Sequence, residues 1–353
     1  MKLSINLDYT SYDVIIEKSI SQKISNHLNA INNGQKFILC FPSTLKSQAL
    51  FINSDLKSNN FDIHKLEIND GEEFKNMEYV QKLADSLMYI GCKRDSILIA
   101  LGGGTVGDII GFLSSIFMRG IRYINIPTSL LAMVDSSIGG KTGVNYNNIK
   151  NFLGTFHHPE LVLIDPDFLL TLNQKQIYSG LGEIVKYGLI DNKEILDDLA
   201  LNYDCIIQLK KTNLISKLIY NSCLVKKKFI EKDVYDNDYR NILNFGHTLG
   251  HIIEVKFQSE SITHGEAVLN GMYLSLKLSR FKEILSKKHY NEILVLLEKF
   301  NIENKYKLNI SDLEKINFDK KSNNHRIRFV LLKNIGVPII SDQITIKDIE
   351  NII

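Results

Sequence analysis

The sequence predicts an α/β fold for the first half of the chain and a mainly α-helical fold for the second half. Short apolar segments alternate with helical patterns as far as Leu172, and ten of the 21 glycines lie between Gly102 and Gly154. Long helical patterns begin at Asn173. Apolar strands that alternate with helices are typical of a parallel sheet covered on both faces. We therefore expect two domains, residues 1–172 and residues 173–353.

In the first half, apolar runs predict strands and a period of 3.6 residues predicts helices. The first 20 residues alternate polar and apolar side chains, which predicts strands and not a secretion signal. Ser96–Leu101 is a short apolar run that ends in three glycines, as a buried parallel strand does. The other predicted elements are strands at Lys36–Phe41, Phe61–Ile68, Tyr123–Ile126 and Leu161–Ile164, and helices at Met77–Ile90 and Val106–Phe117.

The second half contains long amphipathic patterns and a single strand pattern, at Arg326–Lys333. The predicted helices are Gln174–Ile190, Asn213–Lys232, Arg240–Lys256, His264–Glu283 and Lys288–Phe300.

Composition narrows the class of protein. The chain has 353 residues with 42 Lys+Arg and 40 Asp+Glu, and this balance predicts no nucleic-acid or membrane partner. No apolar segment approaches the roughly 20 residues of a membrane-spanning helix. The four cysteines have no C-x-x-C pair, which is typical of a reducing cytoplasm; they are Cys40, Cys92, Cys205 and Cys223. We expect a cytoplasmic globular enzyme or binding protein.

The segment Gly102–Gly107 fits the pattern G-x-G-x-x-G between a predicted strand and a predicted helix. Backbone N–H groups at such a helix start can bind a pyrophosphate. However, the next strand ends at Ile126-Pro127 without the acidic residue that would bind a ribose. Two interpretations stay open, a dinucleotide site or a tight turn required by packing. Asp108 can likewise bind a ligand or cap the helix.

Gly139-Gly140-Lys141-Thr142 resembles the end of a phosphate-binding P-loop, but Asp135 stands where that loop needs its first glycine. Lys141, Lys150 and Asn151 still indicate an anion site, because lysine supplies a point charge and glycine lets the backbone approach. The alternative is a solvated lysine on a loop.

Three segments offer metal-ligating side chains. His247 and His251 are four residues apart on one helical face, His264 begins a later helix, and Glu183 lies in an otherwise apolar helix. A catalytic zinc site uses three nitrogen or oxygen ligands and one open position. Thr248 stands where a zinc protease would have its glutamate, so that class is not favoured. Four basic residues are each predicted to be solvated or to snorkel, with a packed stem and a charged end in water, although together they can surround a polyanionic substrate. They are Lys186, Lys226, Arg240 and Lys320.

Taken in order, these motifs resemble 3-dehydroquinate synthase. The strings that carry the resemblance are LGGGTVGDIIGF, FMRGIRYINIPTSLLAMVDSSIGGKTGVN, KNFLGTFHHPELVLID, GLGEIVKYGLI, NFGHTLGHIIE and HGEAV. The resemblance implies a Rossmann-like domain that binds NAD and a helical domain that holds a divalent metal, zinc or cobalt. It also implies that 3-deoxy-D-arabino-heptulosonate 7-phosphate is converted to 3-dehydroquinate and phosphate, in the second step of the shikimate pathway to chorismate and the aromatic amino acids.

The same resemblance implies roles for single residues. Its metal ligands are Glu183, His247 and His264, so that His251 moves from the metal to the phosphate. Its substrate residues are Asp135, Lys141, Lys186, Lys226, Arg240, Asn244, His251 and a lysine at Lys320 or Lys321. Arg119 and Asn151 would hold phosphate, with Arg119 reaching across a homodimer. Its NAD residues are Glu72, Lys75, Gly103, Gly104, Thr105, Asp108, Thr128, Ser129, Lys141, Lys150 and Thr171.

The chain departs from the family pattern in three ways, one of which is that His264 lies one residue farther from His247 than the pattern places it. No acidic residue follows the second strand near Ser43, and Asp236 replaces a glutamate near Arg240. The alternative functions are a related sugar phosphate cyclase, a metal-dependent alcohol or glycerol dehydrogenase, and a non-catalytic dinucleotide sensor. The dehydrogenase would not need Lys141, Asn151, Arg240 and Asn244, and the sensor would not need the three metal ligands.

Overall fold

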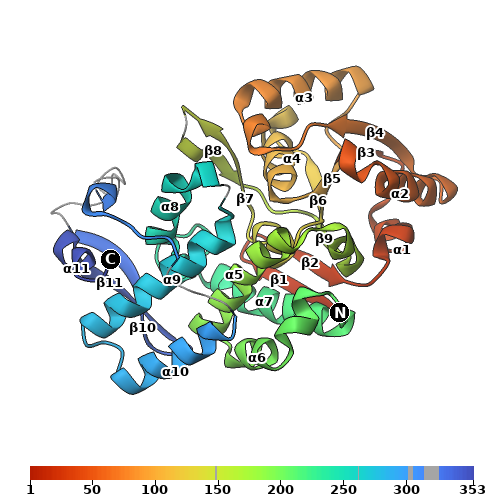
Figure 1. Ribbon diagram of the computed structural model, residues 1–353. Coiled ribbons are helices and arrows are strands. Elements are labelled where there is room, and N and C mark those ends of the chain that lie inside the picture. The colour runs from red at the N-terminus through yellow and green to blue at the C-terminus, as the bar shows by residue number, and fades with distance from the viewer. Residues whose placement is uncertain (148, 261, 301–304, 314–325) are drawn as a thin grey trace. The chain divides into compact units, whose positions relative to one another are not determined.

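The computed structural model describes residues 1–147, 149–260, 262–300, 305–313 and 326–353. The chain divides into two compact units, Met1–Leu172 and Asn173–Ile353 (Figure 1). Each unit has an apolar core of its own. The division falls at the residue where the sequence pattern changes from alternating strands and helices to long helices.

The first unit is built on a seven-stranded sheet. β1 runs antiparallel to β2, and all the other neighbouring strands are parallel. β5 is buried at every position, as expected for a strand that is covered on both faces. The predicted parallel α/β fold is thus confirmed. The order across the sheet is β1 (Lys2–Leu7), β2 (Thr10–Ile16), β9 (Leu161–Ile164), β6 (Arg122–Pro127), β5 (Ile97–Gly102), β3 (Lys36–Pro42) and β4 (Asp62–Ile68).

The sheet has a topological switch point between β3 and β5. The chain passes from β3 to β4 on one side, and then returns to β5 and β6 on the other side. Open parallel sheets bind ligands outside the carboxyl ends of their strands at such a point. β5 ends at Gly102, and α4 (Gly104–Ile116) begins two residues later. The glycine-rich segment therefore lies where the topology favours a ligand.

The remaining elements of the first unit cover or extend the sheet. The Asn76 side chain caps α3 by accepting a hydrogen bond from the Tyr79 N–H, and Gly91 ends α3 at a φ of 78°. A hairpin, β7–β8, was not predicted, because most side chains of β8 are exposed and show no apolar alternation. The elements are α1 (Ser25–Leu28), α2 (Lys46–Ser58), α3 (Met77–Ile90), β7 (Lys141–Tyr146) and β8 (Ile149–Phe156).

The second unit is mainly helical, as predicted. Asn173 and Thr263 each form a capping box, which fixes the first residues of α5 and α9. The core includes residues of α8, α9 and the hairpin β10–β11. The elements are α5 (Gln174–Ile190), α6 (Lys193–Ile207), α7 (Thr212–Lys232), α8 (His247–Lys256), α9 (His264–Phe281), α10 (Lys287–Glu298), β10 (Arg326–Asn334), β11 (Val337–Thr345) and α11 (Ile346–Glu350).

One predicted helix, Arg240–Lys256, is wrong in its first part. Tyr239–Asn244 forms a 3-10 turn, and Gly246 then adopts a φ of 82°. This left-handed conformation breaks the helix, and glycine adopts it without steric cost. The helix itself begins at His247. The other errors are omissions: the hairpin β7–β8, β11, α1, α2, α6 and α11 were not predicted.

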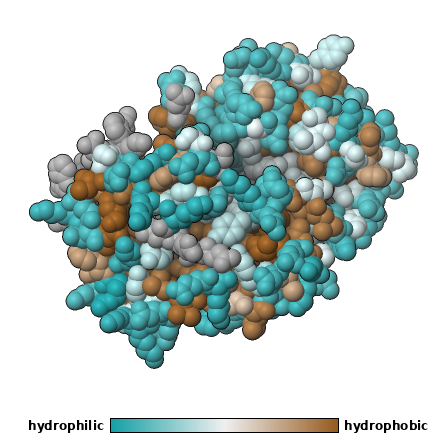
Figure 2. All heavy atoms as spheres, in the orientation of Figure 1, coloured by the Kyte–Doolittle hydropathy of each residue, from teal (hydrophilic) through white to brown (hydrophobic). Residues whose placement is uncertain are grey.

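Two further predictions concern the whole chain. Among the described residues, no helix combines the length and the apolar character that crossing a bilayer requires. The visible face carries mostly hydrophilic side chains, with apolar ones in smaller patches between them (Figure 2). The four cysteines are free thiols, two of them buried.

Candidate active site

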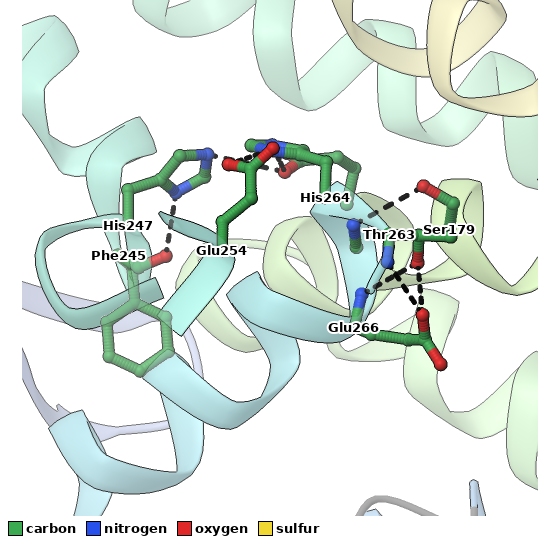
Figure 3. Close-up of polar contacts among 9 residues, drawn as sticks. Ser179, Phe245, His247, Glu254, Thr263, His264 and Glu266 are labelled. Carbon is green, nitrogen blue, oxygen red and sulfur yellow. Dashed lines mark hydrogen bonds and ion pairs between the residues drawn. The ribbon is translucent and has the colours of Figure 1, made fainter. Parts of the chain in front are cut away.

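Three helices of the second unit converge on one carboxylate. Glu183 lies in α5, His247 is the first residue of α8 and His264 is the first residue of α9. The Nε2 atoms of His247 and His264 lie 3.4 Å and 3.5 Å from the same Glu183 Oε1 atom. One ligand atom from each residue can be chosen so that all three lie within 4.8 Å of one another. The three predicted metal ligands are thus adjacent in the structure, and Figure 3 shows both imidazoles.

Glycine lets α5 and α9 approach closely enough to form this group. A Cβ atom on Gly265 would lie 2.0 Å from the Ser179 backbone oxygen, and one on Gly182 would lie 2.7 Å from the Gly265 oxygen. Neither distance is possible for a larger residue. Since Glu183 follows Gly182 and His264 precedes Gly265, the backbone contact brings the two ligands together.

A similar contact places His247. A Cβ atom on Gly271 in α9 would lie 1.9 Å from the Gly246 backbone oxygen, so α8 begins directly against α9. The Nδ1 atom of His247 lies 3.2 Å from the Phe245 backbone oxygen (Figure 3). Because a carbonyl oxygen only accepts hydrogen bonds, Nδ1 carries the proton in this contact. Nε2 is left to face Glu183.

The Glu183 carboxylate is fully buried and lies beside a buried cation. Its Oε2 atom forms an ion pair with Lys186, whose side chain is 2% exposed. Burial raises the pKa of the Glu183 carboxyl, but Lys186 and the two imidazoles outweigh burial and hold this pKa well below its usual range. Neither carboxylate oxygen accepts a hydrogen bond of good geometry from a described residue. A buried carboxylate is unfavourable without a cation beside it, and Lys186 supplies one such cation.

The two imidazoles differ in proton affinity. Burial lowers the pKa of His264, yet Glu183 and Glu254 raise it to about 9. Burial and the nearby Lys186 charge lower the pKa of His247. Two imidazole nitrogens and one carboxylate oxygen, with no fourth protein ligand among the described residues of the group, are the donor set of a catalytic zinc site. The residues therefore fit a divalent metal.

Further basic side chains of this unit are buried, which corrects the prediction that each is solvated. Lys186, Lys226 and Arg240 are 2%, 5% and 3% exposed. Arg240 Nη1 donates to the Val234 oxygen at 2.8 Å. Lysine and arginine are almost never fully buried unless they are paired. The second unit thus holds three cationic side chains in its interior, and one of them, Lys186, is paired with Glu183.

Sequence reasoning missed Asp233, which organises the loop before Arg240. Its carboxylate accepts hydrogen bonds from the N–H groups of Asn237, Asp238 and Arg240 at 3.0, 2.8 and 3.0 Å. Partial burial raises the pKa of Asp233, but these N–H groups outweigh it and lower the pKa. The same loop holds Asp236, at a φ of 58°. An aspartate that bonds to following N–H groups is a local signal for such a turn.

His251 and Asn244 do not join the Glu183 group. His251 is exposed, and its ligand atoms group with Glu254 and His264 instead. The Asn244 Nδ2 atom donates to Asn241 Oδ1 at 3.5 Å. The metal pair His247 and His251, which the spacing favoured, is therefore not the arrangement found around Glu183.

In the first unit, packing requires glycine at one position of the glycine-rich segment and not at the next. A Cβ atom on Gly102 would lie 2.6 Å from the Val106 side chain, so packing requires glycine there. A Cβ atom on Gly103 would meet only Ser129 Oγ, at 3.8 Å. Gly103 is also the N-cap of α4, and no side chain caps this helix. Packing thus does not require glycine at position 103.

Two predicted cofactor residues form a buried ion pair beside this segment. Lys75 Nζ lies 2.5 Å from Asp108 Oδ2, and the side chains are 6% and 19% exposed. Burial raises the pKa of Asp108, and it outweighs the opposing effect of Lys75. For Asp108, the sequence left open a ligand contact or a helix cap. Asp108 does not cap α4, because the N-cap of α4 is Gly103.

Sequence reasoning also missed Asn145, which connects three predicted site residues. Its Nδ2 atom donates to Glu72 Oε1 at 2.7 Å, and its Oδ1 atom accepts from the Asn151 N–H at 2.8 Å. Its own N–H donates to the Lys75 oxygen at 2.7 Å. The string GGKTGVN ends in this residue, and that was the only signal for it.

The other predicted residues of the first unit occupy five places. The Thr128 N–H donates to the Gly102 oxygen at 2.9 Å, which puts Thr128 and Ser129 beside the glycine segment. Asp135 lies in a π-helical turn, a distortion frequent at functional sites. Thr105 lies in the first turn of α4 and Thr171 in a 3-10 helix after β9; Lys141, Lys150 and Asn151 are exposed on β7–β8.

Arg119 is exposed in a strained turn. Met118 and Arg119 adopt φ values of 50° and 69°, which are uncommon for residues other than glycine. Such strain is often found at functional sites. Lys320 and Lys321 lie outside the described residues.

The glycine segment at a sheet switch point and the buried carboxylate–imidazole group define a class: two-domain proteins that pair a Rossmann-like sheet with a helical metal-binding unit. Comparison with known proteins narrows this class. Residues 65–179 match the family model "3-dehydroquinate synthase N-terminal", and residues 180–322 match "3-dehydroquinate synthase C-terminal". The chain belongs to the 3-dehydroquinate synthase family, and is thus an enzyme of the carbon–oxygen lyase class.

Individual relatives agree with this assignment. The 3-dehydroquinate synthase of Clostridium tetani is 45% identical over 84% of this chain and 79% of its own length. That of Thermodesulfovibrio yellowstonii is 38% identical over 100% of this chain and 99% of its own length. The structure of a 2-epi-5-epi-valiolone synthase from Streptomyces hygroscopicus, with NAD+ and Zn2+ bound, has a TM-score of 0.87 at 26% identity, over 98% of this chain and 96% of that chain. Among the predicted alternatives, the synthase is therefore the function shown.

Proposed function

We propose that this chain converts 3-deoxy-D-arabino-heptulosonate 7-phosphate to 3-dehydroquinate and phosphate through the residues described above. NAD and one divalent metal ion are its cofactors, and the substrate is a phosphorylated sugar acid. The observation that carries this proposal is the convergence of both imidazole Nε2 atoms on the Glu183 carboxylate. The Streptomyces cyclase, which holds NAD+ and Zn2+, supports the same cofactors here.

Glu183, His247 and His264 hold the metal ion in this proposal, with zinc as the first choice and cobalt as a substitute. When bound, the metal would supply Lewis-acid polarisation of a substrate oxygen, and NAD would supply reversible hydride transfer. Lys186 supplies a counter-charge to Glu183 inside a site that excludes water. In such surroundings a fixed charge acts more strongly than it does in water.

The basic residues of the second unit bind and orient the anionic substrate in this proposal. Lys226 and Arg240 are preorganised because burial restricts their side chains, and Asp233 fixes the backbone at Arg240. Preorganised charges stabilise developing negative charge without further rearrangement. The roles that the family pattern gives to Asn244, His251 and Asp236 fit this charge distribution.

In the first unit, we assign NAD to the start of α4 and the surrounding side chains. Gly103 and Gly104 would let the pyrophosphate approach backbone N–H groups. Glu72, Lys75 and Asp108 are assigned to the same cofactor: Lys75 pairs with Asp108, and Asn145 donates to Glu72 and to the Lys75 backbone oxygen. Thr105, Thr128, Ser129, Lys150 and Thr171 complete the NAD assignment, and Asp135, Lys141 and Asn151 are assigned to the substrate.

We further propose a homodimer in the cytoplasm, in which Arg119 reaches the site of the partner subunit. Ile116 and Met118 beside Arg119 are 44% and 48% exposed, and Phe152 on β8 is 59% exposed. Exposed apolar side chains of this kind favour an interface between copies. Analytical ultracentrifugation checks the dimer; a monomer at micromolar concentration would contradict it.

The experiment for the function is phosphate release from the heptulosonate phosphate by the purified chain with NAD and zinc, and a parallel sample with chelator. We expect release that stops on chelation and no net accumulation of NADH, because the hydride returns to the substrate. Steady NADH formation from a simple polyol, without phosphate release, would indicate a dehydrogenase instead.

A further inference from the structure

Glu254 is an acidic residue beside the proposed metal ligands. Neither the sequence motifs nor the proposed function gives it a role. It lies on α8, seven residues after His247 and three after His251, so the three side chains share one face of the helix. Its carboxylate is 17% exposed. Figure 3 shows it beside the imidazole of His264, which projects from the start of α9.

His264 faces a different carboxylate with each ring nitrogen. Nε2 lies 3.5 Å from Glu183 Oε1, and Nδ1 lies 3.4 Å from Glu254 Oε2. Glu183 belongs to α5 and Glu254 to α8, so carboxylates from two different helices contact the two nitrogens of the ring. His247 is arranged in the same sense, because its Nδ1 faces the Phe245 backbone oxygen and its Nε2 faces Glu183.

We propose that Glu254 is a positioning residue that orients His264 for the metal. A carboxylate oxygen only accepts hydrogen bonds, so Glu254 favours a proton on Nδ1 and leaves the lone pair of Nε2 for the metal. Acceptors outside the ligand set commonly fix histidine ligands in this way, and their loss weakens metal binding. The inference rests on the proposed metal site and extends it by one residue.

A competing arrangement makes Glu254 a direct ligand. His251, Glu254 and His264 form a second group of side chains with metal-ligand spacing, which shares His264 with the first group. In that arrangement His264 would bridge two ions, and Glu254 would not be a positioning residue. The number of metal ions per chain separates the two arrangements.

The test compares wild type with Glu254→Ala, Glu254→Gln and the control Glu266→Gln, in the full chain. Zinc affinity is measured by competition with a chromogenic chelator in the absence of substrate, and the bound Co2+ spectrum reports ligand geometry. Glu266 is a matched control because it caps α9 through Thr263 and its own N–H, without touching an imidazole (Figure 3). A glutamine retains that capping box.

We expect Glu254→Ala to weaken zinc binding by about 10 to 100-fold, and to alter the Co2+ spectrum. Glu254→Gln should lose less, because the amide oxygen still accepts from Nδ1. Glu266→Gln should stay within about threefold of wild type, and every variant should bind one metal ion at saturation. Should Glu254→Ala fold poorly by circular dichroism, Glu254→Leu takes its place, because leucine fills similar space and cannot accept a hydrogen bond from Nδ1.

Two results would overturn the proposal: zinc affinity unchanged in the Glu254 variants, or two metal ions per wild-type chain with one in Glu254→Ala. Failure of the proposed function is a separate result, because zinc binding is measured without substrate. A wild type that binds zinc tightly but releases no phosphate would reject the synthase reaction and leave the role of Glu254 intact.

Discussion

The two units present their predicted ligand-binding groups by different physical means. In the helical unit, charged side chains from α5, α8 and α9 meet in a buried group around Glu183. In the sheet unit, no side chain caps the start of α4 at Gly103, and the lysines of β7–β8 are exposed. A site made of side chains therefore depends on how distant elements pack, whereas a site made of backbone groups is formed within one strand–helix turn.

We expect the largest effect at His247, in the side-chain site of the helical unit. We expect His247→Ala to remove stoichiometric zinc and to reduce phosphate release on the order of 10³-fold, as loss of a central electrostatic group does. Zinc is measured by elemental analysis and turnover by phosphate release. Thr248→Ala, on the next residue of α8, is the control and should retain both. Full activity with one bound metal ion in His247→Ala would reject the ligand assignment.

The exposed lysines of the sheet unit allow a paired test. Lys141→Ala should raise the KM for the heptulosonate phosphate by about 10 to 100-fold, because a charged hydrogen bond to phosphate is lost. Its effect on the Kd of NAD should be smaller. Lys150→Ala, on the same hairpin, should show the opposite preference. Steady-state kinetics and NAD titration measure both; equal losses in Lys141→Ala would place Lys141 outside the phosphate site.

The glycine segment offers a matched pair of substitutions. Gly103→Ala adds a methyl group that meets only Ser129 Oγ, at an ordinary contact distance of 3.8 Å, so we expect an unchanged Tm and NAD binding weakened by about tenfold. Gly102→Ala places its Cβ 2.6 Å from Val106, and should instead destabilise the fold by about 1–3 kcal/mol. Thermal melts and NAD titration separate these effects. Normal NAD affinity in Gly103→Ala would assign the segment to packing alone.

The smallest expected effect is at Asp233. Asp233→Asn should lower stability by about 1 kcal/mol at neutral pH, because charged hydrogen bonds to three N–H groups are weakened. Since folding lowers the pKa of Asp233, the contribution is present above the ordinary value of 3.8 and is lost as pH falls through the lower folded-state pKa. Urea unfolding at pH 7 and near pH 3 measures this. A difference that grows on acidification would contradict the assignment.

The sequence by itself determined the local features of this protein. The apolar run at Ser96–Leu101 marked β5 within one residue, and the periodicity of Gln174–Ile190 matched α5 at both ends. The motif strings indicated Glu183, His247 and His264 as a ligand set. Such signals extend over a few residues, because periodicity, capping and glycine turns are properties of one segment.

Only the tertiary structure decided which distant groups meet. In the folded chain, Glu254 contacts the Nδ1 atom of His264, and Asn145 donates a hydrogen bond to Glu72. Lys186 is buried in an ion pair with Glu183. Spacing had instead favoured His247 with His251, since neighbours on one helix are visible in sequence and neighbours on two helices are not. The deciding contacts are backbone approaches at Gly265 and Gly271, whose close fit depends on the partner helix. No property of one segment encodes that partner.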